Sequence, residues 1–322
     1  MTDATEEHQC RFVSSRGILK STRTHVASPT SSMRKIPWEF AKRLNSRAGV
    51  IYLTVNQLPR FVRWHLWRIR KPFTLVTGDT IKSVSARDIE PKVFNALLNN
   101  RFLTAWYAQN LDHSHEKLHP IPLGVDYHTL AAAKDGDQHR WGMAQSPGEQ
   151  EATLCQFHVE AGPIVKKIKL AFSNWHFAAD RGNRKECMEQ SDHAAIYFQP
   201  DFLTRTESWK LNSAYAFTLS PLGAGLDCHR TWEALLLGTI PIVTTSPIDP
   251  LYENLPVVIL RSWSELTEAR LKEEFDRLTE GQYDFFRLDL AYWMAKINGR
   301  PAPSTTPMTW DEFRLTLSAK AT

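Results

Sequence analysis

Short apolar runs alternate along the chain with segments of helical periodicity. Buried strands are predicted where apolar and β-branched residues follow one another without interruption. These runs lie at 49–55, 73–77, 103–107, 168–172, 216–219, 240–243 and 256–260. Between them apolar residues recur at helical spacing, as at Val93, Phe94, Leu97 and Leu98. Alternating buried strands and amphipathic helices are typical of parallel sheets covered on both faces, so the pattern predicts an α/β protein.

Polar stretches divide this pattern into three parts. Residues 1–34 are rich in Ser, Thr and Arg without sustained periodicity and are expected to form a disordered tail. A polar stretch over 134–147 predicts a linker between two doubly wound domains, 35–146 and 147–322. Ser146 and Glu149 form a capping box, and Pro147 suits the first helical position, so a helix is expected to begin there.

Further helices are predicted downstream and near Pro37. A helix is expected to begin at Pro37, and another over 229–237. A second capping box, Ser262 with Glu265, predicts a helix that continues to Leu278. Two more helices are expected over 283–297 and 309–318.

Length and composition exclude several classes of protein. A chain of 322 residues exceeds the usual domain size of roughly 100–200 residues. With 42% hydrophobic residues it can bury substantial cores, which excludes wholesale disorder. The four cysteines have neither disulfide-framework nor zinc-ribbon spacing. No apolar run is long enough to span a bilayer and no secretory signal is evident, so we expect a soluble chain, cytoplasmic by default.

Charge is distributed unevenly. Residues 1–71 carry 14 Lys and Arg against 4 Asp and Glu, and the remainder carries 25 against 31. This uneven distribution of charge is compatible with nucleic acid, a membrane surface or an anionic substrate as the partner, and it does not distinguish among them.

Residues 217–243 hold the most specific chemistry. A strand is followed by a loop with Gly223 and Gly225, a short helix and another strand. In open parallel sheets ligands bind beyond the carboxyl ends of strands, where helix N-termini bind anions. Arg230 in the first helical turn suits a diphosphate, and Glu233, three residues later, suits the two hydroxyls of a ribose. The plainer alternative is an Arg230–Glu233 ion pair beside a structural turn.

The full segment resembles the donor-binding segment of the exostosin-like glycosyltransferases. It contains Ser-Pro-x-Gly-x-Gly-x-Asp, His-Arg-x-Trp-Glu-Ala and Gly-x-Ile-Pro-Ile-Val, and the likeness extends over about 168–266. A weaker likeness covers 72–128. The resemblance implies a GT-B fold, with two Rossmann-like domains facing a cleft and the donor bound by the C-terminal domain. It also implies sugar transfer from a UDP- or GDP-sugar to a glycan or other hydroxyl acceptor, inverting, without a bound metal or other cofactor.

Other residues would complete the donor site under this resemblance. Arg184 and Arg181, on the loop after strand 168–172, could neutralise the departing diphosphate, unless that loop is simply a solvated basic turn. The motif itself adds Ser220, Asp227 and His229.

An inverting transfer needs a general base near the acceptor hydroxyl. Asp79, Asp126 and His128 each follow a predicted strand in the N-terminal half. A helix N-cap is an equal alternative for Asp79, and turn or interdomain contacts are the alternatives for Asp126 and His128.

Two further segments carry plausible but weaker signals. The three histidines within 112–119 lack metal-site spacing, so a polar surface loop is expected. Residues 60–71 interleave aromatic and basic side chains, which can bind nucleic acid or lie on a membrane. Apolar residues occur all round the helical wheel, which favours a largely buried crossover helix with snorkelling arginines.

The sequence therefore predicts a glycosyltransferase. A noncatalytic protein that retains the fold and binds a nucleotide sugar or a polyanion such as nucleic acid is the alternative. Nucleic acid is not the expected partner, a peripheral membrane contact stays open, and the pattern does not indicate an oligomeric state.

Overall fold

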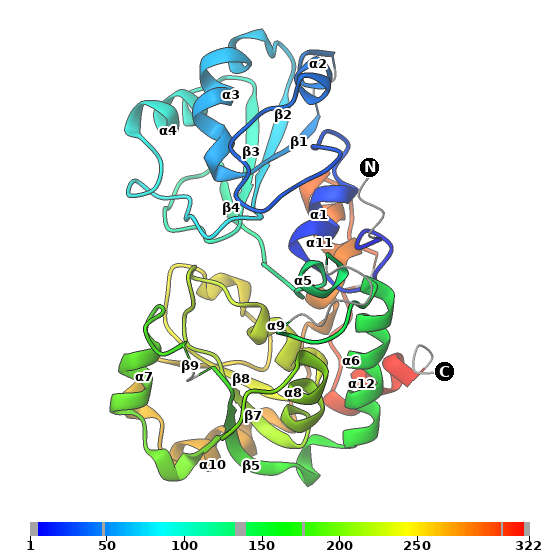
Figure 1. The fold of residues 1–322 in the computed structure, drawn as a ribbon, viewed down its shortest axis with the longest axis vertical. Helices are drawn as coiled ribbons and strands as arrows, with labels where there is room; N and C mark the ends of the chain where they lie inside the picture. Colours follow the sequence, from blue (N-terminus) through cyan, green and yellow to red (C-terminus); the bar gives the residue numbers. More distant parts are fainter. Residues whose placement is uncertain (1–5, 47–48, 133–139, 176–177, 304, 319–322) are drawn as a thin grey trace. The chain divides into compact units, whose positions relative to one another are not determined.

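The computed structural model describes residues 6–46, 49–132, 140–175, 178–303 and 305–318. The chain forms two compact units. Unit 1 consists of residues 1–123 and 289–303, and unit 2 consists of 124–288 and 304–322. Both have a parallel sheet with helices (Figure 1), which confirms the predicted α/β class.

Unit 1 is built on a four-stranded sheet in the order β1-β2-β3-β4. Its strands are β1 (Val50–Leu53), β2 (Phe73–Thr77), β3 (Leu103–Ala108) and β4 (Leu118–Pro120). Its helices are α1 (Ser15–Ser21), α2 (Trp38–Ser46), α3 (Leu58–Trp64), α4 (Pro91–Leu98) and α11 (Leu290–Ile297). Apolar side chains of β1, β2, β3, α3 and α4 share one core. The first three strands match the sequence prediction, because each is an uninterrupted apolar run.

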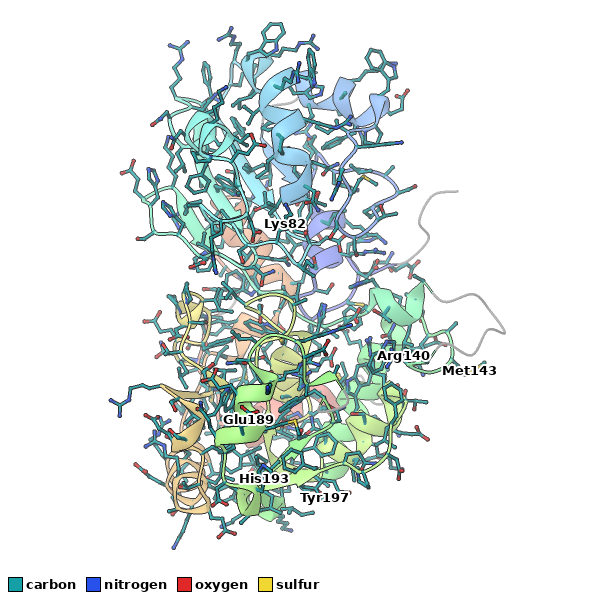
Figure 2. All side chains as sticks on the ribbon, turned by 60° about the vertical axis from the view of Figure 1, so that its left-hand side comes forward. Lys82, Arg140, Met143, Glu189, His193 and Tyr197 are labelled. Atoms are coloured by element: carbon teal, nitrogen blue, oxygen red, sulfur yellow. The ribbon has the colours of Figure 1, made fainter. Side chains whose placement is uncertain are left out.

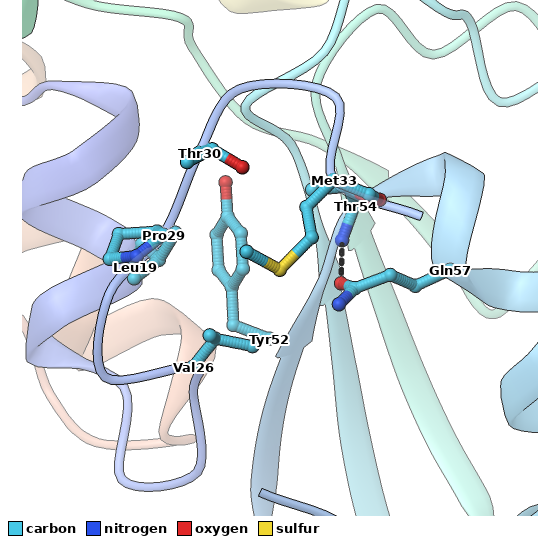
Figure 3. A pocket seen from close by; sticks show the side chains of 8 residues that line it. All are labelled: Leu19, Val26, Pro29, Thr30, Met33, Tyr52, Thr54 and Gln57. Atoms are coloured by element: carbon cyan, nitrogen blue, oxygen red, sulfur yellow. Dashed lines mark hydrogen bonds between the residues drawn. The ribbon is translucent and has the colours of Figure 1, made fainter. Parts of the chain in front are cut away.

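The N-terminal segment differs from the predicted disordered tail. From residue 6 onward it belongs to unit 1, and α1 buries Ile18 and Leu19. Val26 joins the core, and a small pocket lies between the segment and Tyr52 of β1 (Figure 3). The composition of the segment, rich in Ser, Thr and Arg, suggests disorder. Its few apolar side chains are nevertheless buried and hold it against the sheet.

The segment 60–71 also differs from its prediction. It is not one buried helix: α3 ends at Trp64, and a short 3₁₀ turn follows at Leu66–Arg68. Phe61, Leu66 and Ile69 are buried, whereas Trp64 and Trp67 are 55% and 58% exposed. Apolar residues occur on every side of the helical wheel of this segment because two of them are exposed tryptophans, and not because the whole segment is buried.

Unit 2 has a five-stranded sheet in the order β6-β5-β7-β8-β9. The strands are β5 (Ile168–Ser173), β6 (Ile196–Phe198), β7 (Tyr215–Leu219), β8 (Ile240–Thr244) and β9 (Val258–Leu260). The helices are α5 (His128–Ala131), α6 (Pro147–Ala161), α7 (Arg184–Gln190), α8 (Arg205–Asn212), α9 (His229–Leu236), α10 (Glu268–Leu278) and α12 (Trp310–Ser318). All five residues of β7 are buried, as befits a central strand.

The division between the units lies at residue 123 rather than at the predicted 146. Ser146 and Glu149 do form the predicted capping box of α6, but the preceding segment already packs within unit 2. Trp141 contacts the Phe202 ring at 5.0 Å between centroids, and its carbonyl accepts a hydrogen bond from the Arg205 amide. Arg140, which is labelled in Figure 2, has its guanidinium over both aromatic rings, 4.9 and 5.0 Å from their centroids. A helix start thus marks a new element here and not a new unit.

Two C-terminal predictions need correction as well. The segment predicted as one helix over 283–297 is a 3₁₀ turn in unit 2 followed by α11, which returns to unit 1. The Ser262–Glu265 box does not form, because the Ser262 hydroxyl accepts from Ser264 and Glu265 pairs with Arg261. Thr267 caps α10 instead.

None of the helices in the described ranges has the length and apolar character needed to cross a membrane.

The C-terminus of α9 is capped by two buried basic side chains. Lys167 Nζ donates to the carbonyls of Leu237 and Gly238 at 2.8 Å each, and His158 Nδ1 lies 2.9 Å from the Leu236 carbonyl oxygen. Burial lowers the pKa of Lys167 to about 7 and that of His158 to about 3. These groups hold the end of the helix whose first turn carries Arg230.

The stability of the fold should therefore rise with pH through the titration of Lys167. The unfolded chain keeps this lysine protonated up to its ordinary pKa of 10.5, whereas the folded chain releases the proton near pH 7. Between these values the unfolded state binds more protons, so the free energy of unfolding increases with pH, by about 2 kcal/mol from about pH 7 to 9. Urea unfolding of the wild type and Lys167→Met over this range measures the effect. The variant should lack the Lys167 increment, and parallel profiles for the two proteins would contradict the assignment.

Candidate functional site

The site in unit 2 follows from the order of its strands. The chain runs outward from β5 to β6 on one side and to β7, β8 and β9 on the other, so the winding direction reverses between β5 and β7. Both strands are parallel, and the loops after them leave the same edge of the sheet. In sheets of this order, ligands bind where the two loops diverge.

Asn183 ties the loops at this edge together. Its Oδ1 accepts a hydrogen bond from the Leu222 amide at 2.8 Å, and its Nδ2 donates to Thr244 Oγ1 at 3.0 Å. Gly182 has a φ of 54°, and a Cβ there would overlap the carbonyl oxygen of Leu222. The loop after β5 is thus in direct contact with the loop after β7 and with the end of β8.

Two arginines meet at this junction with incomplete hydrogen bonding. Arg184 begins α7 and Arg230 lies in the first turn of α9. Burial, and then the charge of Arg230, lower the pKa of Arg184 to about 10, and burial also lowers the pKa of Arg230. Arg184 Nε and Arg230 Nη1 are buried without a hydrogen-bond partner among the described residues. Adjacent buried guanidinium groups with unused donors are suited to an anion.

The glycine loop opens toward these arginines. A Cβ at Gly223 would lie 3.7 Å from Arg184 Nη2, in ordinary contact distance, and Gly225 lies in the bend that follows. Ser220 holds the loop to α9 through its hydroxyl, 2.9 Å from Thr231 Oγ1. The predicted residues Gly223, Arg184 and Arg230 are therefore brought together, and Arg181, although on the adjoining loop, is exposed.

Asp227 has a structural position. Both carboxylate oxygens accept from Trp232 Nε1 at 2.9 Å, and Oδ1 also accepts from the Cys228 amide at 2.8 Å. The side chain is buried, and these bonds fix the loop to α9.

Glu233 lies on α9 one turn after Arg230. Its Oε1 accepts from the Asp126 amide at 3.2 Å and its Oε2 from Trp209 Nε1 at 3.0 Å. The alternative of an Arg230–Glu233 ion pair does not occur among the described salt bridges. A carboxylate has about four lone-pair positions, so each oxygen retains capacity for a ligand hydroxyl.

Asp126 and His128 form a dyad in unit 2, and not in the N-terminal domain where they were predicted. Arg205 Nη2 pairs with Asp126 Oδ2 at 2.6 Å, and His128 Nδ1 lies 3.0 Å from Asp126 Oδ1. Burial raises the pKa of Asp126, but Arg205 and the nearby His229 and His128 outweigh it and hold the pKa well below its usual range. The carboxylate is therefore ionised and orients the imidazole of His128.

His229 completes this group. Its Nδ1 lies 2.7 Å from the Gly124 carbonyl oxygen, and burial is the main reason why its pKa is lowered. The rings of His128 and His229 are 5.8 Å apart. Asp126 and the two histidines have atoms within 4.8 Å of one another, a spacing that a metal ion could use. Arg205 already neutralises Asp126, however, and would repel a divalent cation, so the arrangement favours proton handling over metal binding.

Asp79 occupies a different environment, in unit 1. It follows β2 with a φ of 51° and is 4% exposed. Its Oδ1 accepts from the Ser31 hydroxyl at 2.8 Å, and its Oδ2 lies 3.8 Å from Arg16 Nε. The predicted N-cap role does not occur, since the carboxylate joins the N-terminal segment to the sheet.

Sequence reasoning missed three residues that hold the site together: Arg205, Trp209 and Asn183. Arg205 follows Thr204, whose capping box with Glu207 signals the start of α8 and thus a position near a sheet edge. Neither Trp209 nor Asn183 has a comparable signal, because their partners are distant in sequence.

Comparisons with known proteins add two remote structural alignments. No protein-family model matches the sequence, and no curated protein matches it either. An α1,3-fucosyltransferase crystal structure aligns with a TM-score of 0.33 and 14% identity, over 90% of this chain and 93% of that chain. An α1,3-fucosyltransferase structure with GDP-fucose aligns with a TM-score of 0.32 and 12% identity, over 94% and 95%.

The Asp126–Arg205 pair should make a large contribution to stability. Removing either partner leaves the other charge buried, so Asp126→Ala and Arg205→Ala should each lower the free energy of unfolding by about 3 kcal/mol at neutral pH. The Asp126 contribution is present above its ordinary pKa of 3.8 and is lost as the pH falls through its lower folded-state value. Urea unfolding of both variants and the double variant gives the coupling energy. Additive losses would contradict a direct pair.

Proposed function

We propose that the protein is a glycosyltransferase that transfers a sugar from a nucleotide-diphosphate sugar to an acceptor hydroxyl. The carrying observation is the pair of buried, incompletely hydrogen-bonded guanidinium groups of Arg184 and Arg230 beside the glycine loop. Their position at the winding reversal of a parallel sheet supports a nucleotide ligand. The likeness of 217–243 to the exostosin-like donor segment, and the two parallel-sheet units, support a GT-B enzyme of that type.

Arg184 and Arg230 would hold the diphosphate, with the first turn of α9 adding amide donors. Glu233, one turn further along α9, would accept the ribose hydroxyls through the lone pairs that Trp209 and the Asp126 amide leave available. Arg181, being exposed, would contribute only long-range attraction. The co-substrate is a UDP- or GDP-sugar.

The Asp126–His128 dyad supplies the best-oriented base among the three candidates. With Nδ1–H directed to Asp126, the neutral imidazole of His128 carries its lone pair on Nε2. The acceptor oxygen attacks the anomeric carbon while its proton passes to Nε2, and the bond from that carbon to the diphosphate breaks. The negative charge that develops on the leaving diphosphate is stabilised by Arg184 and Arg230. This single displacement inverts the anomeric centre and requires no metal.

Donor binding tests the proposal directly. Arg184→Ala and Arg230→Ala should each weaken the affinity for the bound UDP- or GDP-sugar by about 10–100-fold, because each removes a charge-assisted contact. Lys185→Ala is the matched control: this exposed neighbour loses the same charge and should change affinity by less than about threefold. Calorimetric titration with a panel of UDP- and GDP-sugars measures the affinity of the wild type and of each variant. Failure of every nucleotide sugar to bind, or unchanged binding by Arg230→Ala, would refute the proposal.

The identity of the base can be tested in the transfer reaction. His128→Asn should lower kcat by about 10²–10⁴-fold with little change in donor affinity, since it removes proton transfer but no phosphate contact. Asp79→Asn is the comparison, because it removes the carboxylate of another of the predicted bases. A loss confined to Asp79→Asn would transfer the role to that residue. Donor binding without turnover by the wild type toward any hydroxyl acceptor would instead favour the noncatalytic nucleotide-sugar binder.

A further inference from the structure

Exposed basic and aromatic side chains are concentrated in one segment of unit 1, which we call the exposed stripe. It consists of six residues from α3, the 3₁₀ turn after it and the chain just beyond: Arg60, Arg63, Trp64, Trp67, Arg68 and Lys71. All six side chains are exposed, while Phe61, Leu66 and Ile69 of the same segment enter the core. The core packing therefore fixes which side chains face outward.

The stripe is strongly positive and has no compensating acids nearby in sequence. Residues 40–78 contain eight Lys and Arg and no Asp or Glu. The described salt bridges give no partner to any of the six residues. Such a surface complements an extended anionic partner.

The two tryptophans add an apolar component that charge alone would not require. At 55% and 58% exposure they are costly to leave in water, and large exposed apolar groups mark interaction sites. The Arg63 guanidinium lies 4.7 Å from the Trp64 ring centroid, and that of Arg68 lies 4.8 Å from the Trp67 ring centroid. Each indole thus carries a cation on one face.

We propose that this stripe docks unit 1 onto the surface of an anionic lipid bilayer. Indoles prefer the boundary between headgroups and acyl chains, and each paired guanidinium would then lie at the level of the lipid phosphates. The four basic residues and the two indoles supply both contributions to interfacial binding, which are apolar insertion and attraction to anionic headgroups.

A nucleic-acid strand fits the same stripe less well. Stacking with bases needs open ring faces, and in Trp64 and Trp67 one face is taken by an arginine. A bilayer surface accommodates both groups, with the indole ring at the headgroup boundary and its arginine at the lipid phosphates. This inference does not depend on the activity proposed for unit 2.

Sedimentation with lipid vesicles tests the inference on the full chain. The wild type should bind vesicles of phosphatidylcholine with about 30 mol% phosphatidylserine at least about tenfold more strongly than pure phosphatidylcholine. Trp64→Ala with Trp67→Ala should lower that binding by about tenfold, and so should Arg63→Glu with Arg68→Glu. Because all four side chains are exposed, thermal melts should show folded variants.

The matched control changes net charge equally at another place. Lys210→Glu with Lys272→Glu, both exposed in unit 2, alters the charge by the same amount and should leave vesicle binding within about twofold of the wild type. The proposal would be overturned if the arginine and lysine double variants lost vesicle binding equally, or if the tryptophan double variant retained it. Tighter binding of a labelled single-stranded oligonucleotide than of the vesicles at the same salt would assign the stripe to nucleic acid instead.

Discussion

The reversal of winding between β5 and β7 is the constraint on which the candidate site depends. The loops that follow these strands diverge at the sheet edge, and Asn183 fixes their positions by bonding to the loop after β7 and to the last residue of β8. Arg184 and Arg230 begin the helices that follow β5 and β7, so their meeting is a consequence of topology and not of sequence proximity. Burial lowers the pKa of both arginines, and the charge of Arg230 lowers the pKa of Arg184 further. An anion between them would remove that repulsion.

The remaining polar groups show how the fold supports this arrangement. Asp227 is held by Trp232 under the loop, and Ser220 by Thr231, so the loop is fixed from the core side while the arginines keep donors unused. At the other end of α9, Lys167 and His158 satisfy carbonyls that would otherwise be buried without donors. The helix is therefore held at both ends, and its first turn has little freedom to move away from Arg184. Such preorganisation reduces the cost of ordering the site when a ligand binds.

The sequence predicted the strands of both sheets that are continuous apolar runs, because these follow from local pattern. Gly223 and Arg230 were proposed for one site from a contiguous motif, whereas Arg184 was added to it from a separate loop through the family resemblance. Sequence reasoning failed where the decisive contacts join distant segments. The N-terminal segment has the composition of a disordered tail, yet Ile18, Leu19 and Val26 are buried. Asp126 and His128 were predicted on the acceptor side because the polar stretch near 140 looked like a linker, whereas Arg205 and Glu233 bind Asp126 within unit 2. The short strands β4 and β6 have too few residues to show a period.

The positive charge of the chain acts in two physically different settings. In unit 2, Arg184 and Arg230 are largely removed from water, so their field is weakly screened and acts over a few ångströms on a compact anion. In unit 1, the arginines of the exposed stripe are solvated, and salt screens them beyond about 8–10 Å, so each contributes little alone and they act together only on an extended surface. Burial, more than the count of basic residues, therefore decides what each group can bind. The excess of positive charge in the first 71 residues is thus suited to attracting an extended surface, whereas the proposed chemistry relies on two arginines in the mildly acidic remainder of the chain.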